Sequence, residues 1–212
     1  MALTGGRESM SSSDAPPRSG SRVGGDGGHG GFAVRCAKTA DIPALQSLIE
    51  RSARSLCAVD YTDEQIEGAL GTAWAVDTQL IEDATYFVIE RHEGGAAEIV
   101  ACGGWSHRGT LFGGDAATVR EARRLDPTTE SARVRAFFIA PEHARRGLGS
   151  LLLERCEHEA AAAGFGSCEL VATLTGVRLY AARGYVAREP IEHPLPAGGT
   201  IRFVPMVKQL SG

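Results

Sequence analysis

The stretch from Val134 to Leu153 constrains the fold of this chain more than any other. An apolar run at residues 136–139 predicts a strand, and Pro141 ends it because proline lacks the N–H that sheet pairing needs. A basic, glycine-bearing turn follows at residues 145–150. A helix then begins, with apolar residues spaced to share one face: Leu148, Leu151, Leu152, Cys156 and Ala160. Such a turn offers free backbone N–H groups and the positive end of a helix dipole to an anion. It therefore predicts a phosphate or pyrophosphate site, with a merely structural tight turn as the alternative.

Two familiar phosphate-binding patterns do not fit these residues. No Gly-Lys-Ser/Thr follows the turn, so it is not a P-loop. The spacing Gly147-x-Gly149 lacks the third glycine of a dinucleotide fingerprint. What remains is a backbone site, in which both glycines lack the Cβ atoms that would hold a phosphate away from the amides.

The turn and the residues that follow it resemble the GNAT superfamily of acetyl-CoA-dependent N-acetyltransferases. The run Ala144-Arg145-Arg146-Gly147-Leu148-Gly149 has both glycines of that family's Q/R-x-x-G-x-G/A motif, with Ala144 in place of the usual Gln or Arg. The run Leu179-Tyr180-Ala181-Ala182-Arg183-Gly184-Tyr185 resembles its second signature, L-Y-x-x-x-G-F/Y. Residues 173–176 occupy a region where the family often places an Asn. The resemblance extends over residues 32–208.

The resemblance implies a role for each motif. The residues expected to bind the cofactor are Phe138 and Ile139, whose backbone would pair with pantetheine, and Arg145, Arg146, Gly147, Leu148, Gly149 and Ser150, whose amides would hold the pyrophosphate. Tyr180 is the expected general acid, near the departing sulfur. A phenol with a pKa of about 10 can protonate a thiolate of pKa about 8.5 and stay neutral at pH 7. The alternative is that Tyr180 only packs against its neighbours.

The implied fold is α/β, with a mixed, mostly antiparallel central sheet flanked by helices. The implied function is transfer of the acetyl group of acetyl-CoA to a primary amine by direct attack. The acceptor is a small-molecule amine or an exposed protein amine, and members of the family often form homodimers. Two other functions stay open: a protein acetyltransferase acting on Lys or an N-terminus, and a non-catalytic acyl-CoA-binding sensor or interaction module.

Composition narrows the class of protein. The length of 212 residues and the local composition predict a Gly/Ser-rich, disordered tail at residues 1–31 and a single domain at residues 32–212. The net charge of −4 argues against nucleic-acid binding. No window is apolar enough for a membrane span. Five scattered cysteines show no metal spacing and are typical of small buried residues in a reducing cytosol. We therefore expect a cytoplasmic protein that binds no metal, nucleic acid or membrane.

Periodicity predicts the remaining elements. Strands are expected at 32–36, 86–89, 98–105, 168–173 and 200–207, and helices at 42–56, 62–70, 76–82 and 177–183. Thr62 and Gln65 have capping-box spacing. A turn at 92–95 should join a hairpin, and residues 192–199 should form a loop. Trp74 and Trp105 are expected in the core.

An insertion at residues 107–132 separates two predicted strands by far more than the common loop length of about 2–6 residues. We expect it to cover the acceptor site, with a disordered insert as the alternative.

The sequence does not identify the general base that would take a proton from the amine. The candidates are a chain of water molecules or one of four side chains: Asp60, Tyr61, His107 and Glu130.

Overall fold

The computed structural model describes residues 31–116 and 121–210, which form a mixed sheet with helices on both faces. The eight-stranded sheet has the order β1-β2-β3-β4-β5-β8-β6, and β7 also pairs with β8. Only β4 and β5 are parallel neighbours. The strands are β1 (Phe32–Cys36), β2 (Tyr86–Glu93), β3 (Ala96–Ser106), β4 (Ala132–Ile139), β5 (Ser167–Thr173), β6 (Val186–Ala187), β7 (Ile191–Pro194) and β8 (Thr200–Gln209). The predicted fold class is confirmed. The expected tail at 1–31 lies, apart from Gly31, outside the described residues.

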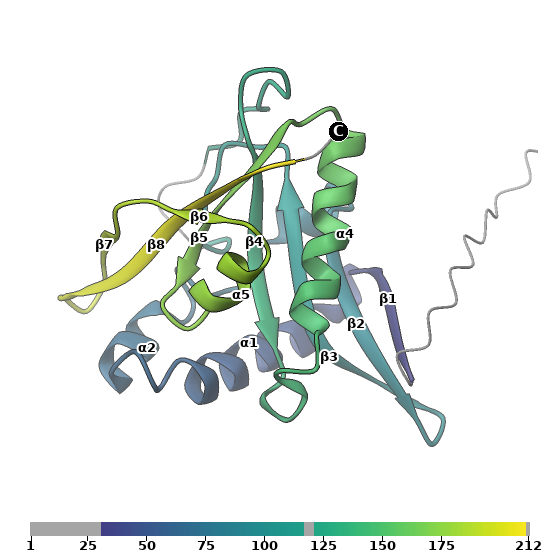
Figure 1. Cartoon of the computed structure of the whole chain (residues 1–212). Helices are drawn as coiled ribbons and strands as arrows, with labels where there is room; N and C mark the ends of the chain where they lie inside the picture. The colour runs from purple at the N-terminus through teal and green to yellow at the C-terminus, as the bar shows by residue number, and fades with distance from the viewer. Residues whose placement is uncertain (1–30, 117–120, 211–212) are drawn as a thin grey trace, which may run out of the picture.

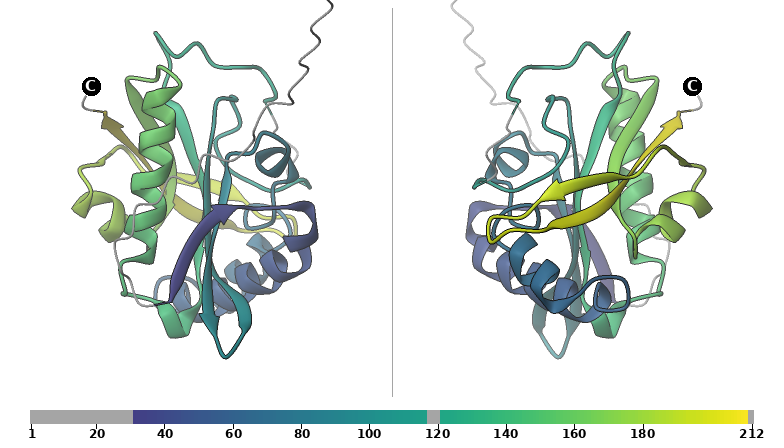
Figure 2. Two further views of the ribbon diagram at one scale, coloured as in Figure 1. Left: turned by 90° about the vertical axis from the view of Figure 1, so that its right-hand side faces the viewer. Right: turned by 90° about the vertical axis from the view of Figure 1, so that its left-hand side faces the viewer.

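The helices cover the two faces of the sheet unequally. They are α1 (Ile42–Leu56), α2 (Asp63–Ala69), α3 (Thr78–Glu82), α4 (Leu148–Ala162) and α5 (Val177–Ala182), with short 3-10 turns at Thr39–Asp41 and Pro141–His143. Figure 1 shows α4 crossing one face of β2, β3 and β4, with α5 beside it. Figure 2 shows α1 and α2 on the opposite face.

Side-chain caps account for the start of two helices, α2 and α3. The Thr62 hydroxyl accepts a hydrogen bond from the Gln65 amide at 3.3 Å, and the Gln65 side chain accepts one from the Thr62 amide at 3.1 Å, so the predicted capping box is present. The prediction placed the start of α3 too early. Residue 77 is extended, and its carboxylate accepts from the Gln79 amide at 3.1 Å, which makes Asp77 the N-cap.

Two other expectations are wrong. The expected loop at 192–199 is shorter, because Ile191–Pro194 form β7 and pair with Phe203–Thr200 of β8. This strand lies at an edge of the sheet, where a proline is tolerated. Cys36 is exposed, whereas the other four cysteines are buried. Both tryptophans are buried as expected, each with 5% of its surface exposed.

The insertion between β3 and β4 is attached to the rest of the domain in its described parts. At its start, the Arg108 guanidinium forms two hydrogen bonds to the Asp83 carboxylate, at 2.6 and 2.8 Å. Further along, the Gly114 amide donates to the Thr72 carbonyl at 2.9 Å. A Cβ atom on Gly114 would lie 2.4 Å from the Cβ of Ala75, so the insertion packs closely on the segment between α2 and α3.

The Arg108–Asp83 pair should make stability depend on pH in the acid range. Hydrogen bonds from Arg108 lower the pKa of Asp83 below its ordinary value of 3.8. A depressed folded-state pKa means that ionised Asp83 stabilises the fold above pH 3.8 and that this contribution is lost as pH falls through the folded-state value. We expect Asp83→Asn to be less stable than wild type at neutral pH and to lose less stability on acidification, as measured by urea unfolding at a series of pH values. An identical pH slope in both proteins would contradict this.

Candidate active site

The strands β4 and β5 pair over only two positions. Ala132 pairs with Cys168 and Arg133 with Glu169, after which the two strands diverge, as Figure 1 shows. Residues 134–139 of β4 continue to pair with β3 but have no strand partner toward β5. We call residues 134–139 the open edge. Backbone groups along such an edge can pair with an extended ligand as an added strand would.

The glycine turn before α4 presents a series of unpaired amides. Arg145 and Gly147 both have left-handed backbone, with φ of 61° and 83°. Among the described residues, no amide from Arg145 to Ser150 donates a hydrogen bond to a backbone or side-chain acceptor. A Cβ atom on Gly147 would meet nothing within 4 Å, so the space beside this glycine is open. Successive amides in such a turn, at the start of a 15-residue helix, form an anion-binding concavity.

The second predicted motif lies against this turn. A Cβ atom on Gly149 would lie 2.9 Å from Leu179 Cδ2, so the glycine allows α5 to approach α4 closely. The Ser150 hydroxyl accepts a hydrogen bond from Arg183 Nε at 3.0 Å. The fold therefore brings the two motifs together, although about thirty residues separate them.

The Tyr180 side chain extends from α5 to Phe137 on the open edge. Its ring centroid is 6.2 Å from that of Phe137 and 5.8 Å from that of Tyr185, both in edge-on contacts. The side chain is buried, and burial raises the pKa of its phenol above the ordinary value of 10, so it stays neutral at pH 7. Within the described part of the chain, its hydroxyl forms no hydrogen bond. The phenol is thus a neutral donor beside the open edge.

Two of the four candidate bases lie near the end of β5. The Tyr61 hydroxyl donates to the Arg202 carbonyl at 2.7 Å and accepts from the Leu174 amide at 2.8 Å. Burial raises its pKa above the ordinary value. The Asp60 carboxylate accepts from the Thr175 hydroxyl at 2.7 Å. Both side chains thus connect the α1–α2 turn to the segment where the family often places an Asn.

The other two candidates lie at the far end of β4, where it pairs with β3. His107 follows Ser106, which pairs with Arg133, and its Nε2 is 3.7 Å from the Asp83 carboxylate. Burial lowers the pKa of His107. Glu130 binds the Arg123 guanidinium at 2.8 Å, and this pairing lowers its pKa to about 2. A carboxylate held in this way is a poor proton acceptor.

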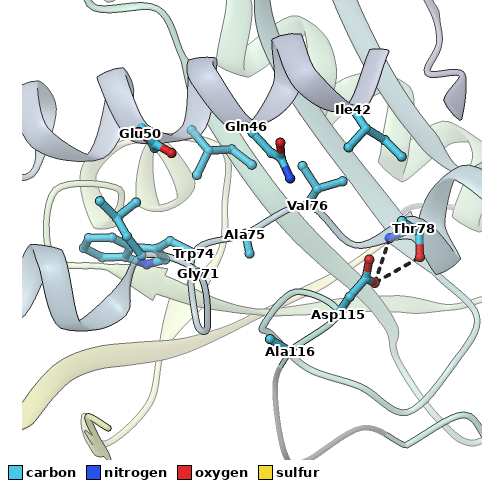
Figure 3. A pocket seen from close by; sticks show the side chains of 12 residues that line it. Ile42, Gln46, Glu50, Gly71, Trp74, Ala75, Val76, Thr78, Asp115 and Ala116 are labelled. Carbon is cyan, nitrogen blue, oxygen red and sulfur yellow. Dashed lines mark hydrogen bonds between the residues drawn. The ribbon is translucent and has the colours of Figure 1, made fainter. Parts of the chain in front are cut away.

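The face opposite α4 carries a cluster of rings and a cavity. Neighbouring rings of the cluster have centroids 5.0–6.3 Å apart; they belong to Tyr61, Trp74, Phe112, His193 and Phe203. Burial lowers the pKa of His193. A cavity of about 280 Å³ lies between α1 and residues 70–78. Figure 3 shows Trp74 on one side of it and Asp115 on the other. Asp115 accepts hydrogen bonds from the amide and hydroxyl of Thr78, both at 3.0 Å.

A buried ion pair on this face was missed by sequence reasoning. Arg135 Nη1 is 2.7 Å from Asp77 Oδ2, and the two side chains are 3% and 0% exposed. Arg135 Nη2 also donates to the Gly113 carbonyl at 2.7 Å. One guanidinium thus joins the open edge, the cap of α3 and the insertion. Arg135 stands between Val134 and Ala136 in a strand that is mostly apolar, and this was the available signal, because a buried charge needs a partner.

Neither a membrane-spanning helix nor a metal-binding cluster is found in the ranges that the structure describes. None of the helices there combines the length and the apolar character that crossing a bilayer requires. The same residues contain no group of three or more His, Cys, Asp or Glu side chains arranged to hold a metal ion.

Comparisons with known proteins support the same family. Residues 119–210 match the family profile described as an acetyltransferase (GNAT) domain. A GCN5-related N-acetyltransferase from Rhodopseudomonas palustris has a similar structure (TM-score 0.58, 18% identity, covering 84% of this chain and 95% of that one). The PaiA N-acetyltransferase of Thermoplasma acidophilum in complex with coenzyme A is also similar in structure (TM-score 0.54, 13% identity, covering 84% of this chain and 98% of that one). A third similar structure is that of a putative acetyltransferase from Salmonella typhimurium with acetyl-CoA (TM-score 0.55, 16% identity, covering 86% of this chain and 95% of that one).

No protein with a curated description matches the chain. The match to the family profile and the shared fold nevertheless confirm the resemblance to the GNAT superfamily that the two motifs predicted.

Proposed function

We propose that this chain is an N-acetyltransferase that transfers the acetyl group of acetyl-CoA to a primary amine. The observation that carries the proposal is the run of unpaired amides from Arg145 to Ser150, which opens beside α5 and leads to the open edge of β4. Two of the similar structures are described as holding coenzyme A or acetyl-CoA. The residues present fit such a ligand: an anion site, an unpaired strand edge and a neutral phenol adjoin one another.

The binding roles follow from these positions. The amides of Arg145, Arg146, Gly147, Leu148, Gly149 and Ser150 would hold the pyrophosphate. The backbone of Phe138 and Ile139 would pair with pantetheine along the open edge. The Ile139 amide already donates to the Ser52 hydroxyl of α1 at 3.3 Å, so pairing through this amide requires Ser52 to give up or share the bond.

Acetyl-CoA would supply the acetyl group as a thioester that is open to attack by an amine. Tyr180, neutral at pH 7, would donate its phenol proton to the departing sulfur, so that CoA leaves as a thiol, and the phenolate would regain a proton from water. The acceptor amine would approach from the face that carries α1 and the insertion, because α4 and α5 occupy the other. No general base is assigned to a residue, and bulk water can take the ammonium proton.

Calorimetric titration with CoA tests the donor site. We expect wild type to bind with a roughly micromolar dissociation constant, and Gly147→Trp to bind at least about tenfold more weakly because the indole would fill the open space beside Gly147 in the turn. Gly95→Trp is the matched control: Gly95 has φ of 84° and also has open space around it, but lies in the β2–β3 turn. Equal weakening by both substitutions, or no binding by wild type, would refute the site.

An acceptor screen tests the reaction itself. A panel of small primary amines and of peptides with free N-termini or lysines would be incubated with acetyl-CoA, and released CoA thiol and acetylated product would both be measured. If the protein binds CoA but acetylates no amine or peptide of the panel, the result would favour a non-catalytic acyl-CoA sensor.

A further inference from the structure

The open edge contains a bulge with an unusual backbone. Cys102 of β3 pairs with Phe138 of β4, but Gly104 pairs with Arg135, so two β4 residues oppose the single residue Gly103. One of the two is Ala136, which has left-handed backbone at φ 57°. An alanine pays a steric cost in this region, so neighbouring contacts must hold it there.

Those contacts come from a side chain on β2, which reaches across β3. Tyr86 is fully buried and pairs with Gly104. A Cβ atom on Gly104 would lie 3.1 Å from Tyr86 Cδ2 and 2.7 Å from the Thr85 carbonyl oxygen. Glycine at this position therefore allows the tyrosine ring to pass β3 and reach the bulge in β4.

The far end of the ring meets the bulge at its carbonyl group. The Tyr86 hydroxyl lies 3.4 Å from the Ala136 carbonyl oxygen and 3.3 Å from the Cys102 sulfur. The Cys102 thiol lies 3.7 Å from the same carbonyl oxygen. Two buried donors thus converge on the carbonyl of the one left-handed residue in the strand.

Fixing this carbonyl also fixes the peptide groups that follow it. A bulge changes which backbone groups of a strand point toward each neighbour. The next residue, Phe137, has its ring against Tyr180, and a Cβ atom on Gly103 would lie 2.7 Å from that ring. The position of the bulge therefore decides how Phe137 and the Phe138 backbone are presented at the open edge.

We propose that Tyr86, with Cys102, is a positioning residue that holds the Ala136 bulge so that the open edge aligns a bound acetyl thioester with Tyr180. The inference rests on the proposed function. Neither side chain touches the ligand; both act through the carbonyl of Ala136.

Tyr86→Phe tests this, because it removes only the hydroxyl. We expect kcat to fall about tenfold or more, since small misplacements of reacting groups have effects of this size. The CoA dissociation constant should change by much less than kcat, because the amides of the glycine turn that would hold the pyrophosphate stay in place. Hydrogen exchange at the amides of residues 135–139, measured by mass spectrometry, should become faster. Tyr185→Phe, another buried tyrosine, is the matched control and should change none of the three.

A second variant separates positioning from general stability. Glycine adopts left-handed backbone without the Cβ penalty, so Ala136→Gly should keep the bulge without the Tyr86 hydroxyl. In that background, Tyr86→Phe should have little further effect on kcat or on exchange. A fall in melting temperature with unchanged kcat, or an equal loss in both backgrounds, would overturn the inference. Should wild type bind CoA but acetylate no amine, the proposed function fails, and the exchange data alone decide whether Tyr86 holds the bulge.

Discussion

Arg135→Met is expected to lower the free energy of unfolding by about 3–5 kcal/mol, because it leaves the fully buried Asp77 carboxylate without this guanidinium. The loss of the hydrogen bond to the Gly113 carbonyl adds to the effect, since the insertion loses one attachment to β4. Urea unfolding, followed by circular dichroism, measures the change.

A double-mutant cycle with Asp77→Asn shows whether the ion pair is the cause. Asparagine at position 77 can still accept the hydrogen bond from the Gln79 amide, so the cap of α3 is kept. The double variant should be clearly less destabilised than the sum of the single variants, because neither charge is then left buried alone. Arg51→Met is the surface control: Arg51 pairs with Glu142 at 3.1 Å with 45% of its side chain exposed, and its loss should not be measurable. Strict additivity in the cycle would contradict this explanation.

Tyr180→Phe is expected to lower kcat by at least about tenfold while CoA binding stays unchanged. The substitution keeps the ring contacts with Phe137 and Tyr185 and removes only the proton donor. The measurement is the steady-state rate with the best amine from the acceptor screen, together with calorimetric titration with CoA.

Tyr185→Phe again serves as the comparison, because Tyr185 is 3% exposed and its ring lies 5.8 Å from that of Tyr180. It should keep the wild-type rate. A wild-type rate for Tyr180→Phe would remove Tyr180 from the mechanism and favour the packing role, whereas loss of CoA binding would show that the hydroxyl acts on the ligand rather than on the reaction.

Sequence reasoning predicted the features that depend on neighbouring residues. The strand, the glycine turn and the start of α4 lie within one continuous stretch, and the Thr62–Gln65 cap spans a single helical turn. Periodicity placed β1, α1 and β5 within about a residue of their observed bounds. The two motifs also predicted which segments would meet, and the contact of Gly149 with Leu179 agrees with this.

What escaped prediction depends on residues far apart in the chain. The Tyr86 hydroxyl meets the Ala136 carbonyl only after β2, β3 and β4 are in register, and Arg135 of β4 meets Asp77 at the start of α3 only in the folded domain. The bulge could not be predicted from the sequence because its left-handed residue, Ala136, is not the glycine that is typical of such positions. The pair Gly103-Gly104 was a usable signal, since adjacent glycines within a strand indicate close approach by another group. The short β7 was missed because it ends in Pro194, and a proline argues against a strand unless the strand lies at the edge of a sheet, which the sequence does not reveal.

The brief contact between β4 and β5 has a consequence for the cohesion of the molecule. Backbone pairing across the centre of the sheet rests on two residue pairs, Ala132 with Cys168 and Arg133 with Glu169. The strands before this junction form one half-sheet, and those after it form another around β8. A molecule lying along both diverging edges would act as the strand that the sheet lacks. The donor substrate would thus be a structural component of the folded protein for as long as it is bound, joining two halves that otherwise share little backbone pairing.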